Sequence, residues 1–256
     1  VKLCEITKSV GIIIFYFINE MIIEDVSFKD FNLQGSGKDA VLNFKKLTKV
    51  DIQRISFEGL TLDDTTLFYF IPDDTTNNDA ANSEITIVDF EAKQLTFVIK
   101  SYFMVNQISN SKMTIRNSIF SKCIIKQGNA LFVIITFQLI IWENSLFESN
   151  NFKNEDNSHY GVLSFYQMQN QNVIYINNIT FTENIFKGFS LISFDKFDGK
   201  LNFSITGLTV QRNLLILDSV APLIISLEFL SQDLIIDYVI VGLNIINNSF
   251  YGKNDN

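Results

Sequence analysis

A repeated unit of about 30 residues is the feature that most constrains how this chain can fold. Its clearest copy is residues 176–186, INNITFTENIF, with apolar residues at positions one, four, six and eleven and Asn at position nine. The frame places its sixth position on Phe28, Phe57, Phe90, Phe120, Phe147, Phe181, Val210 and Val241. Successive copies lie 27 to 34 residues apart, so the repeat runs along the whole chain.

The ninth position of the frame changes character along the chain. It falls on Phe31, Leu60, Lys93 and Cys123 in the first half, and on Asn150, Asn184, Asn213 and Asn244 in the second. Stacked Asn side chains can hydrogen-bond from one unit to the next, and Asn tolerates left-handed backbone in turns. We therefore predict a structural ladder of Asn150, Asn184, Asn213 and Asn244 at a turn.

A second element, a small residue followed by an apolar run, comes after most copies of the frame. It occurs at residues 11–13, 40–42, 130–132, 161–163, 190–192 and 221–223. Both elements are rich in β-branched and aromatic residues with period-two alternation, and neither shows sustained helical spacing. The pattern predicts two or three short strands in each unit and essentially no helix.

A unit built only of strands cannot bury both of its faces, so successive units must stack. Parallel strands stacked about 4.8 Å apart form a right-handed β-solenoid. We therefore predict an all-β fold, a right-handed parallel β-helix of about eight coils of ~30 residues, as one domain over residues 1–256. The 25 Phe and 36 Ile would fill the inward columns.

The same frame also fits the leucine-rich-repeat pattern LxxLxLxxNxL. The residues that match it are Ile236, Val239, Val241, Asn244 and Ile246. A leucine-rich-repeat-like solenoid is therefore the alternative architecture, and it predicts a helix or a loose turn on the convex side.

Two pairs of motifs resemble a known family. Residues 147–150 (FESN) and 181–184 (FTEN) are followed by 161–163 (GVL) and 190–192 (SLI). They are similar to the FxxN and GGA[I/V/L] repeats of polymorphic outer-membrane proteins, which belong to the pectin-lyase-like parallel β-helix superfamily. GG pairs are absent here, and the first four units lack the Asn. The resemblance implies an adhesive or structural stalk at the cell surface or in the extracellular space.

Charge and hydropathy narrow the range of partners. The chain has 20 basic and 28 acidic residues, a net charge of -8, which argues against nucleic acid as a partner. Its most apolar runs are too short, or too interrupted by Asp218, Pro222 and Glu228, to form a transmembrane helix. We expect protein partners, either stacked copies of this chain or the rest of a longer chain, with glycans as a further class.

Both ends of the chain resemble coils that have no cap. Residues 11–17 match the second element of a unit whose first half is missing, and the frame stops soon after Asn247. Uncapped solenoids expose unpaired strand edges. We expect the chain to be a segment of a longer solenoid with open ends, or to stack end to end into a fibre or a scaffold.

The residues give little support for catalysis. Pectinolytic β-helix enzymes would show clustered Asp residues beside a His or Arg base, whereas His159 lies in an Asn-rich loop and Arg54, Arg116 and Arg212 are scattered. The prediction is a non-catalytic module without a cofactor. A carbohydrate-active protein that binds or cleaves polysaccharide is the alternative.

One acidic loop is the only weak candidate for a metal site. Asp73, Asp74 and Asp79 can supply the oxygen ligands that Ca²⁺ prefers. Their spacing matches neither an EF-hand nor an RTX nonapeptide. A solvated acidic loop is therefore the favoured interpretation.

Three N-glycosylation sequons begin at Asn178, Asn202 and Asn247. The frame directs Asn178 and Asn202 outward, as a glycan requires. Cys4 and Cys123 lie about four coils apart, on the order of 19 Å, which exceeds the ~7 Å limit for a disulfide. Cys123 is predicted to be a small core residue at position nine.

Overall fold

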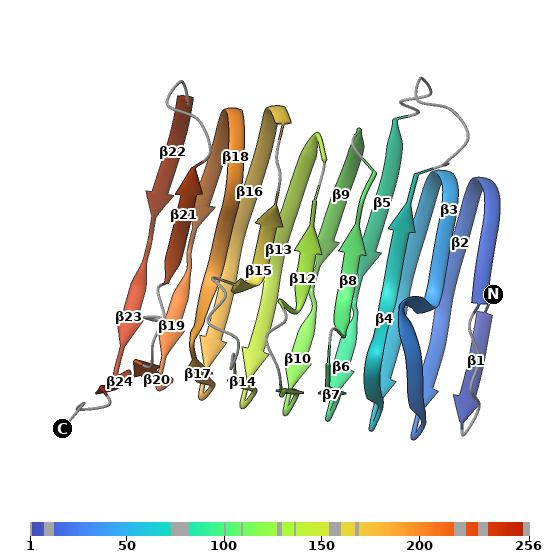
Figure 1. Ribbon diagram of the computed structural model, residues 1–256, viewed down its shortest axis with the longest axis horizontal. Coiled ribbons are helices and arrows are strands. Elements are labelled where there is room, and N and C mark those ends of the chain that lie inside the picture. The colour runs from blue at the N-terminus through green and yellow to red at the C-terminus, as the bar shows by residue number, and fades with distance from the viewer. Residues whose placement is uncertain are drawn as a thin grey trace.

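The computed structural model describes residues 2–7, 13–72, 82–99, 101–108, 110–126, 130–135, 137–153, 160–166, 169–217, 224–229 and 235–252. In these ranges the chain forms 24 β-strands and no helix. Figure 1 shows the strands side by side along a rod, with the N-terminus at one end and the C-terminus at the other.

The strands are numbered in chain order. The first twelve are β1 (Lys2–Thr7), β2 (Ile13–Lys29), β3 (Asn32–Glu58), β4 (Thr61–Ile71), β5 (Ser83–Val88), β6 (Glu91–Lys93), β7 (Thr96–Phe97), β8 (Tyr102–Asn106), β9 (Ser111–Arg116), β10 (Ile119–Ser121), β11 (Ile124–Ile125) and β12 (Phe132–Ile134). The other twelve are β13 (Leu139–Glu148), β14 (Asn151–Lys153), β15 (Tyr160–Tyr166), β16 (Gln169–Thr182), β17 (Ile185–Lys187), β18 (Phe189–Thr206), β19 (Thr209–Gln211), β20 (Leu214–Leu217), β21 (Ile225–Phe229), β22 (Ile235–Val241), β23 (Asn244–Ile246) and β24 (Ser249–Gly252).

Strands pair in parallel with strands one repeat earlier, one repeat later, or both. In this register Phe120 pairs with Phe147, and Phe147 pairs with Phe181. All the pairs described are parallel, and together they join the strands into one continuous sheet. The predicted all-β parallel solenoid is therefore confirmed.

The leucine-rich-repeat alternative is wrong. No helix occurs in the described part of the chain, and two of the residues that matched its pattern are not in the core. Val239 and Val241 face outward, with 54% and 56% of their surface exposed. The alternating apolar residues of β22 and β23 match the leucine-rich-repeat pattern by coincidence. Both that pattern and a β-strand place apolar residues two or three positions apart.

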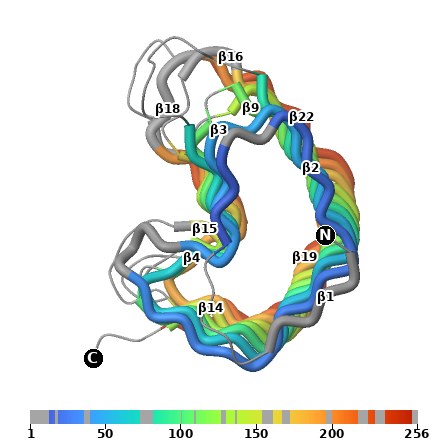
Figure 2. The backbone as a smooth tube through the Cα atoms, turned by 90° about the vertical axis from the view of Figure 1, so that its right-hand side faces the viewer, coloured from blue at the N-terminus to red at the C-terminus, as the bar shows by residue number. Residues whose placement is uncertain are grey.

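The end-on view shows how the stacked coils enclose a core. Figure 2 shows stacked coils around a kidney-shaped outline, with β2 and β22 on the long convex wall and β4 and β15 at the indentation. One coil is built from β16, β17 and the first part of β18. Because the coils stack in register, each inward position becomes a column that runs along the axis.

Aromatic side chains fill several of these columns. Phe120, Phe147 and Phe181 stack with ring centroids 4.7 and 4.6 Å apart, close to the spacing of parallel strands. Phe28 and Phe57 stack in the same way at 4.9 Å. All five rings are at most 2% exposed. Burial of one such ring contributes about 1.5–3 kcal/mol, so the columns supply much of the stability of the rod.

Two assignments of the sixth position need correction. Ala92, and not Phe90, pairs with Phe57 and Phe120, so position nine of that coil is Leu95 and not Lys93. Ile245, and not Val241, pairs with Val210. Phe90 lies two residues before the true position and still faces the core, because residues two apart on a strand share a face.

Left-handed backbone marks the two tight turns of each coil. At position three it occurs at Asp25, Arg54, Asp89, Asn117, Asn144, Asn178, Gly207 and Gly242, and at position eight at Asp30, Gly59, Gln94, Lys122, Ser149, Glu183, Arg212 and Asn247. These φ values lie between 50° and 69°. The Asn residues of the ladder do not have left-handed φ, so that part of the prediction is wrong. The turn is made by the residue just before position nine.

The small residue of the second element leaves room for a close approach between coils. A Cβ atom on Gly161 would lie 2.6 Å from the backbone nitrogen of Ser193 in the next coil. The Gly161 N–H donates instead to the Ser193 hydroxyl at 3.0 Å, and that hydroxyl lies 2.6 Å from the Ser164 hydroxyl. A small residue here therefore lets a buried polar row form between β15 and β18.

Candidate functional site

A column of buried amides runs through the second half of the rod. Asn150, Asn184 and Asn213 are each 1% exposed. The backbone N–H of Cys123 donates to Oδ1 of Asn150. In the same way Asn150 donates to Asn184, Asn184 to Asn213, and Asn213 to Asn248, all over 2.8 to 2.9 Å. We call these four Asn residues with Cys123 the amide column.

The side-chain nitrogens of the amide column are paired as well. Each Asn Nδ2 donates to a main-chain oxygen of the preceding coil, at Phe120, Phe147, Phe181 and Val210 in turn. The Nδ2 groups of the first three also donate to the side-chain oxygen of the following Asn over 2.9 to 3.0 Å. Each inner amide therefore has both its donors and its acceptor used, as burial of a polar group requires.

Asn244 was predicted to belong to this ladder and does not. It begins β23, pairs with Thr209 and is exposed. The last unit is longer than the average, so the frame slips by four residues and Asn248 takes position nine. The sequence signal was present, because Ile245 and Asn248 have the FxxN spacing with Ile in place of Phe.

The last described coil presents an apolar face without a covering layer. Tyr238, Ile240, Leu243, Ile245 and Phe250 are 38–65% exposed. The residues below them in the same columns are buried: Phe203, Ile205, Leu208, Val210 and Leu215, all at most 4% exposed. We call this surface of β22, β23 and β24 the terminal face.

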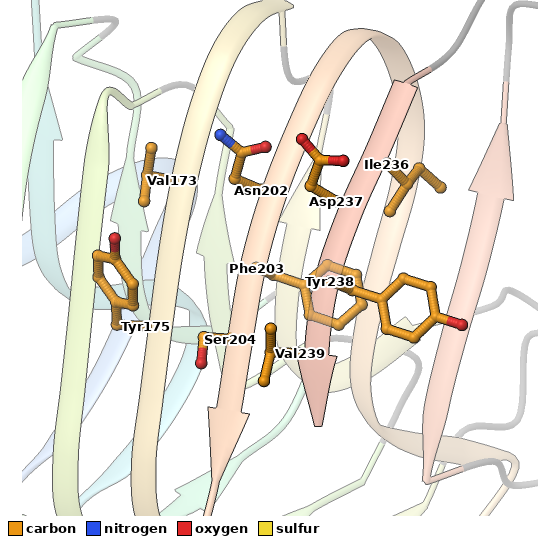
Figure 3. Close-up of a pocket in the computed structure, with 9 residues that line it drawn as sticks. All are labelled: Val173, Tyr175, Asn202, Phe203, Ser204, Ile236, Asp237, Tyr238 and Val239. Carbon is orange, nitrogen blue, oxygen red and sulfur yellow. The ribbon is translucent and has the colours of Figure 1, made fainter. Parts of the chain in front are cut away.

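A groove of about 470 Å³ lies on the outer side of β16, β18 and β22. Its lining residues are Val173, Tyr175, Asn202, Phe203, Ser204, Ile236, Asp237, Tyr238 and Val239, shown in Figure 3. Strand pairing places Ser204 between Tyr175 and Val239 in one outward row. The hollow exists because a small side chain separates two larger ones. We call it the outer groove.

Polar groups occupy the second row of the outer groove. Asn202 lies between Val173 and Asp237, and the Asp237 carboxylate is 3.0 Å from the Lys200 ammonium group. The Asn202 Oδ1 atom is buried and has no hydrogen-bond partner among the described residues. The groove therefore combines an aromatic wall, a hydroxyl, an amide and an ion pair. The sequence did not reveal it, because it depends on which residues of three separate units become neighbours.

The three sequons occupy different surroundings. Asn178 and Asn247 are exposed in turns with φ of 54° and 52°. The Asn178 side chain donates to Asn144 Oδ1 at 2.9 Å. Asn202 lies inside the outer groove and is only partly exposed. All three stay predicted modification sites, and the intact mass of the chain secreted from a glycosylating host would check them.

The candidates for metal binding and catalysis are not brought together in the described residues. Asp73, Asp74, Asp79 and His159 lie outside them. In the described ranges no group of three or more His, Cys, Asp or Glu residues could hold a metal ion.

The three Arg residues form ion pairs between coils, on the outer surface. Arg54 contacts Asp25 and Glu24 over 2.6 and 3.0 Å, and these hydrogen bonds raise the pKa of its guanidinium group. Arg116 contacts Glu143 at 2.8 Å, and Arg212 contacts Glu183 at 3.1 Å. Each Arg therefore links two adjacent coils.

Cys123 ends the amide column on its N-terminal side. Its Sγ lies 3.6 Å from the Ser121 carbonyl oxygen and 3.7 Å from that of Ala92. Burial raises the pKa of the thiol to about 12. This environment fits the predicted core role and leaves no reactive thiolate at neutral pH.

These features define the class of protein, a parallel β-solenoid. No family model matches the chain, and no curated protein matches it in sequence. One similar solved structure is the Streptococcus pneumoniae surface protein and adhesin PfbA, with 8% identity, coverage of 92% of this chain and 78% of that chain, and a TM-score of 0.18. A TM-score this low carries no inference about function. Within the residues that the structure describes, no helix is long and apolar enough to cross a membrane.

Proposed function

We propose that this chain is a non-catalytic structural and adhesive module, a stiff segment of a larger surface or extracellular protein. The observation that supports this role is the unbroken set of inward columns from β2 to β22. Each coil pairs with its neighbours along the described strands, so bending the rod would break stacked rings and strand hydrogen bonds at once. Such a rod holds attached partners at a fixed distance.

A combined measurement tests this role. Small-angle scattering of the purified chain should give the profile of a rod, with a cross-section that does not change when the salt concentration rises. Incubation with pectin, alginate and chondroitin should release no new reducing ends and no unsaturated products. Release of either product would contradict a non-catalytic module, and a compact spherical profile would contradict a stiff spacer.

The outer groove favours a second candidate function, binding of a neutral saccharide. Its two walls, Tyr175 and Val239, stand two strand spacings apart, about 9.6 Å. One ring needs about 3.5–4 Å to each wall, so a single ring fits between them, whereas an α-helix of about 10–12 Å does not. The hydroxyl of Ser204 and the amide of Asn202 offer hydrogen bonds to the edge of such a ring.

Charge also favours a neutral ligand in this groove. Asp237 is already balanced by Lys200, and the net charge of -8 disfavours anions. In a screen of immobilised neutral glycans, Tyr175→Ala should weaken binding at least tenfold, because the aromatic wall is lost. Tyr251→Ala is the matched control, since Tyr251 is 65% exposed and outside the groove. Equal binding by all three proteins would exclude the groove as the saccharide site.

A further inference from the structure

We propose that the terminal face binds a further parallel β-coil that carries Asn at the position facing Asn248. The partner is a β-solenoid coil of another sequence, and it would extend the rod along its axis. This inference rests on the proposed structural role and names the chemistry of the partner.

Two hydrogen-bond donors on the terminal face point to the identity of that residue. At Asn150, Asn184 and Asn213 the backbone N–H and the side-chain Nδ2 both donate to the Oδ1 atom of the next Asn. Among the described residues Asn248 donates only to the Val210 carbonyl oxygen. Its backbone N–H and its second Nδ2 hydrogen are therefore arranged like the two donors of Asn150, Asn184 and Asn213. In each of those three residues the two donors share one side-chain carbonyl oxygen of the next coil.

The apolar groups around Asn248 fit the same partner. Tyr238 stacks on Phe203 at 5.7 Å on one side only, and Ile240, Leu243, Ile245 and Phe250 each have a buried neighbour only below them. On the side away from β18, β19 and β20, the strands β22, β23 and β24 pair with no other described strand. An exposed parallel edge with apolar side chains is a template for one more strand layer. A coil in register would extend the existing columns and the strand pairing together.

The chemistry of position nine also separates such a coil from a second copy stacked by its N-terminal end. The pairing of Ile6 with Phe28 makes Ser9, which lies outside the described residues, the position-nine residue of the first coil. Serine has a short side chain with a hydroxyl and no carbonyl oxygen, so it does not supply the acceptor that Asn Oδ1 supplies three times below Asn248. A coil with Asn does.

The test adds a defined coil to the full chain. Residues 218–252 are repeated once directly after Gly252, so that the added coil follows β24 as residues 218–252 follow β20. A matched version carries Asn248→Leu in the added copy only, because Leu60 and Leu95 show that Leu fits this column. The unextended chain is the reference. Amide hydrogen exchange at Asn248, read by NMR, is the measurement, and sedimentation gives the oligomeric state.

The expected results separate the proposal from its alternatives. With Asn in the added coil, exchange at the Asn248 amide should slow at least tenfold relative to the unextended chain. With Leu, the amides of β22 and β23 should be protected while Asn248 exchanges rapidly. Equal protection of Asn248 in both versions, or in neither, would overturn the proposal. Dimerisation of the unextended chain that protects Asn248 would also overturn it, because a second copy would then cover the face. None of these outcomes depends on whether the rod is adhesive or catalytic.

Discussion

At the scale of single residues, the amide column shows why one Asn in each coil is retained inside an apolar core. Asn184 accepts two hydrogen bonds at Oδ1, from Asn150 N and Nδ2, and donates to Phe147 and Asn213. Every polar atom of the buried side chain is therefore paired. The neighbouring residue, Glu183, adopts the left-handed turn with φ of 59°, so the amide holds the corner of the coil together.

Replacement of that amide should be costly. Asn184→Leu keeps the branching at Cγ but leaves the donors of Asn150 without an acceptor, at about 1–3 kcal/mol for each group. We expect the free energy of unfolding, measured by urea denaturation, to fall by about 2–4 kcal/mol. Asn177→Leu, at an exposed outward position of the same strand, is the control and should change it by less than about 0.5 kcal/mol. Equal effects of the two changes would show that the column adds no stability.

Cys123 makes the stability depend on pH in the alkaline range. Its thiol has a pKa of about 12 in the folded chain, against about 8.5 when unfolded. Because the folded pKa is the higher one, this contribution is complete below pH 8.5 and is lost as pH rises towards 12. Cys123→Ala should therefore show a weaker loss of stability between these limits, measured by urea denaturation at a series of pH values. Parallel curves for the two proteins, or alkylation of Cys123 in the folded chain at neutral pH, would disagree with this environment.

At the scale of single elements, the turn at position three bends the chain just before the sixth position of the frame. It separates two strands at Asp89, Asn117, Gly207 and Gly242, and in the other coils it lies within one continuous strand. The residues there are Asp, Asn, Arg or Gly, and all have left-handed φ. Asp and Asn tolerate this conformation better than other residues with a Cβ atom, and β-branched residues tolerate it worst. The turn rather than the strand therefore limits which sequences can form a coil.

Gly207 offers a direct test of this turn. Its φ is 67°, and a Cβ atom there would lie 3.5 Å from Asn178, an ordinary contact. Gly207→Asp should lower the free energy of unfolding by no more than about 1 kcal/mol, because Asp is less strained at this φ than most residues with a Cβ atom, and Asp25 and Asp89 adopt it in other coils. Gly207→Val should lower it by about 1–3 kcal/mol through backbone strain. Thermal denaturation of both variants is the measurement. An equal loss of stability in the two would mean that the available space, and not the φ angle, restricts this position.

At the scale of the whole molecule, stability should vary along the rod. Inner coils such as the one containing Phe147 are covered on both sides, whereas described residues cover the coil of β22, β23 and β24 on one side only. In a solenoid each coil gains stability only from its neighbours. The terminal coil should therefore open first, without unfolding of the middle.

Hydrogen exchange along the chain tests this gradient. We expect the amides of β22 to exchange at least a hundredfold faster than those of β13 and β16, because local opening costs less free energy at the end of the rod. Exchange followed by mass spectrometry resolves these segments. Uniform protection from β13 to β22 would show that the chain unfolds as one unit, or that the terminal face is covered in solution.

The class of fold follows from local and periodic features of the sequence. Period-two alternation, the repeat of about 30 residues and the Asn at position nine are local or periodic properties, and they led to parallel strands, inward Phe columns and three of the four ladder residues. The register of individual coils could not be predicted from local sequence. Ala92 and Asn248 took positions that the frame had given to Phe90 and Asn244, because hydrogen bonds between coils decide which residues align when loops differ in length.

The positions of the outer groove and the terminal face depend on how the coils stack. The outer groove exists because Tyr175, Ser204 and Val239, from three different coils, fall in one row. The terminal face exists because the columns that bury Phe203 and Val210 continue to Tyr238 and Ile245 and find no further layer among the described residues. An apolar strand residue looks the same in the sequence whether it is covered or exposed, because its burial depends on the coil that stacks above it.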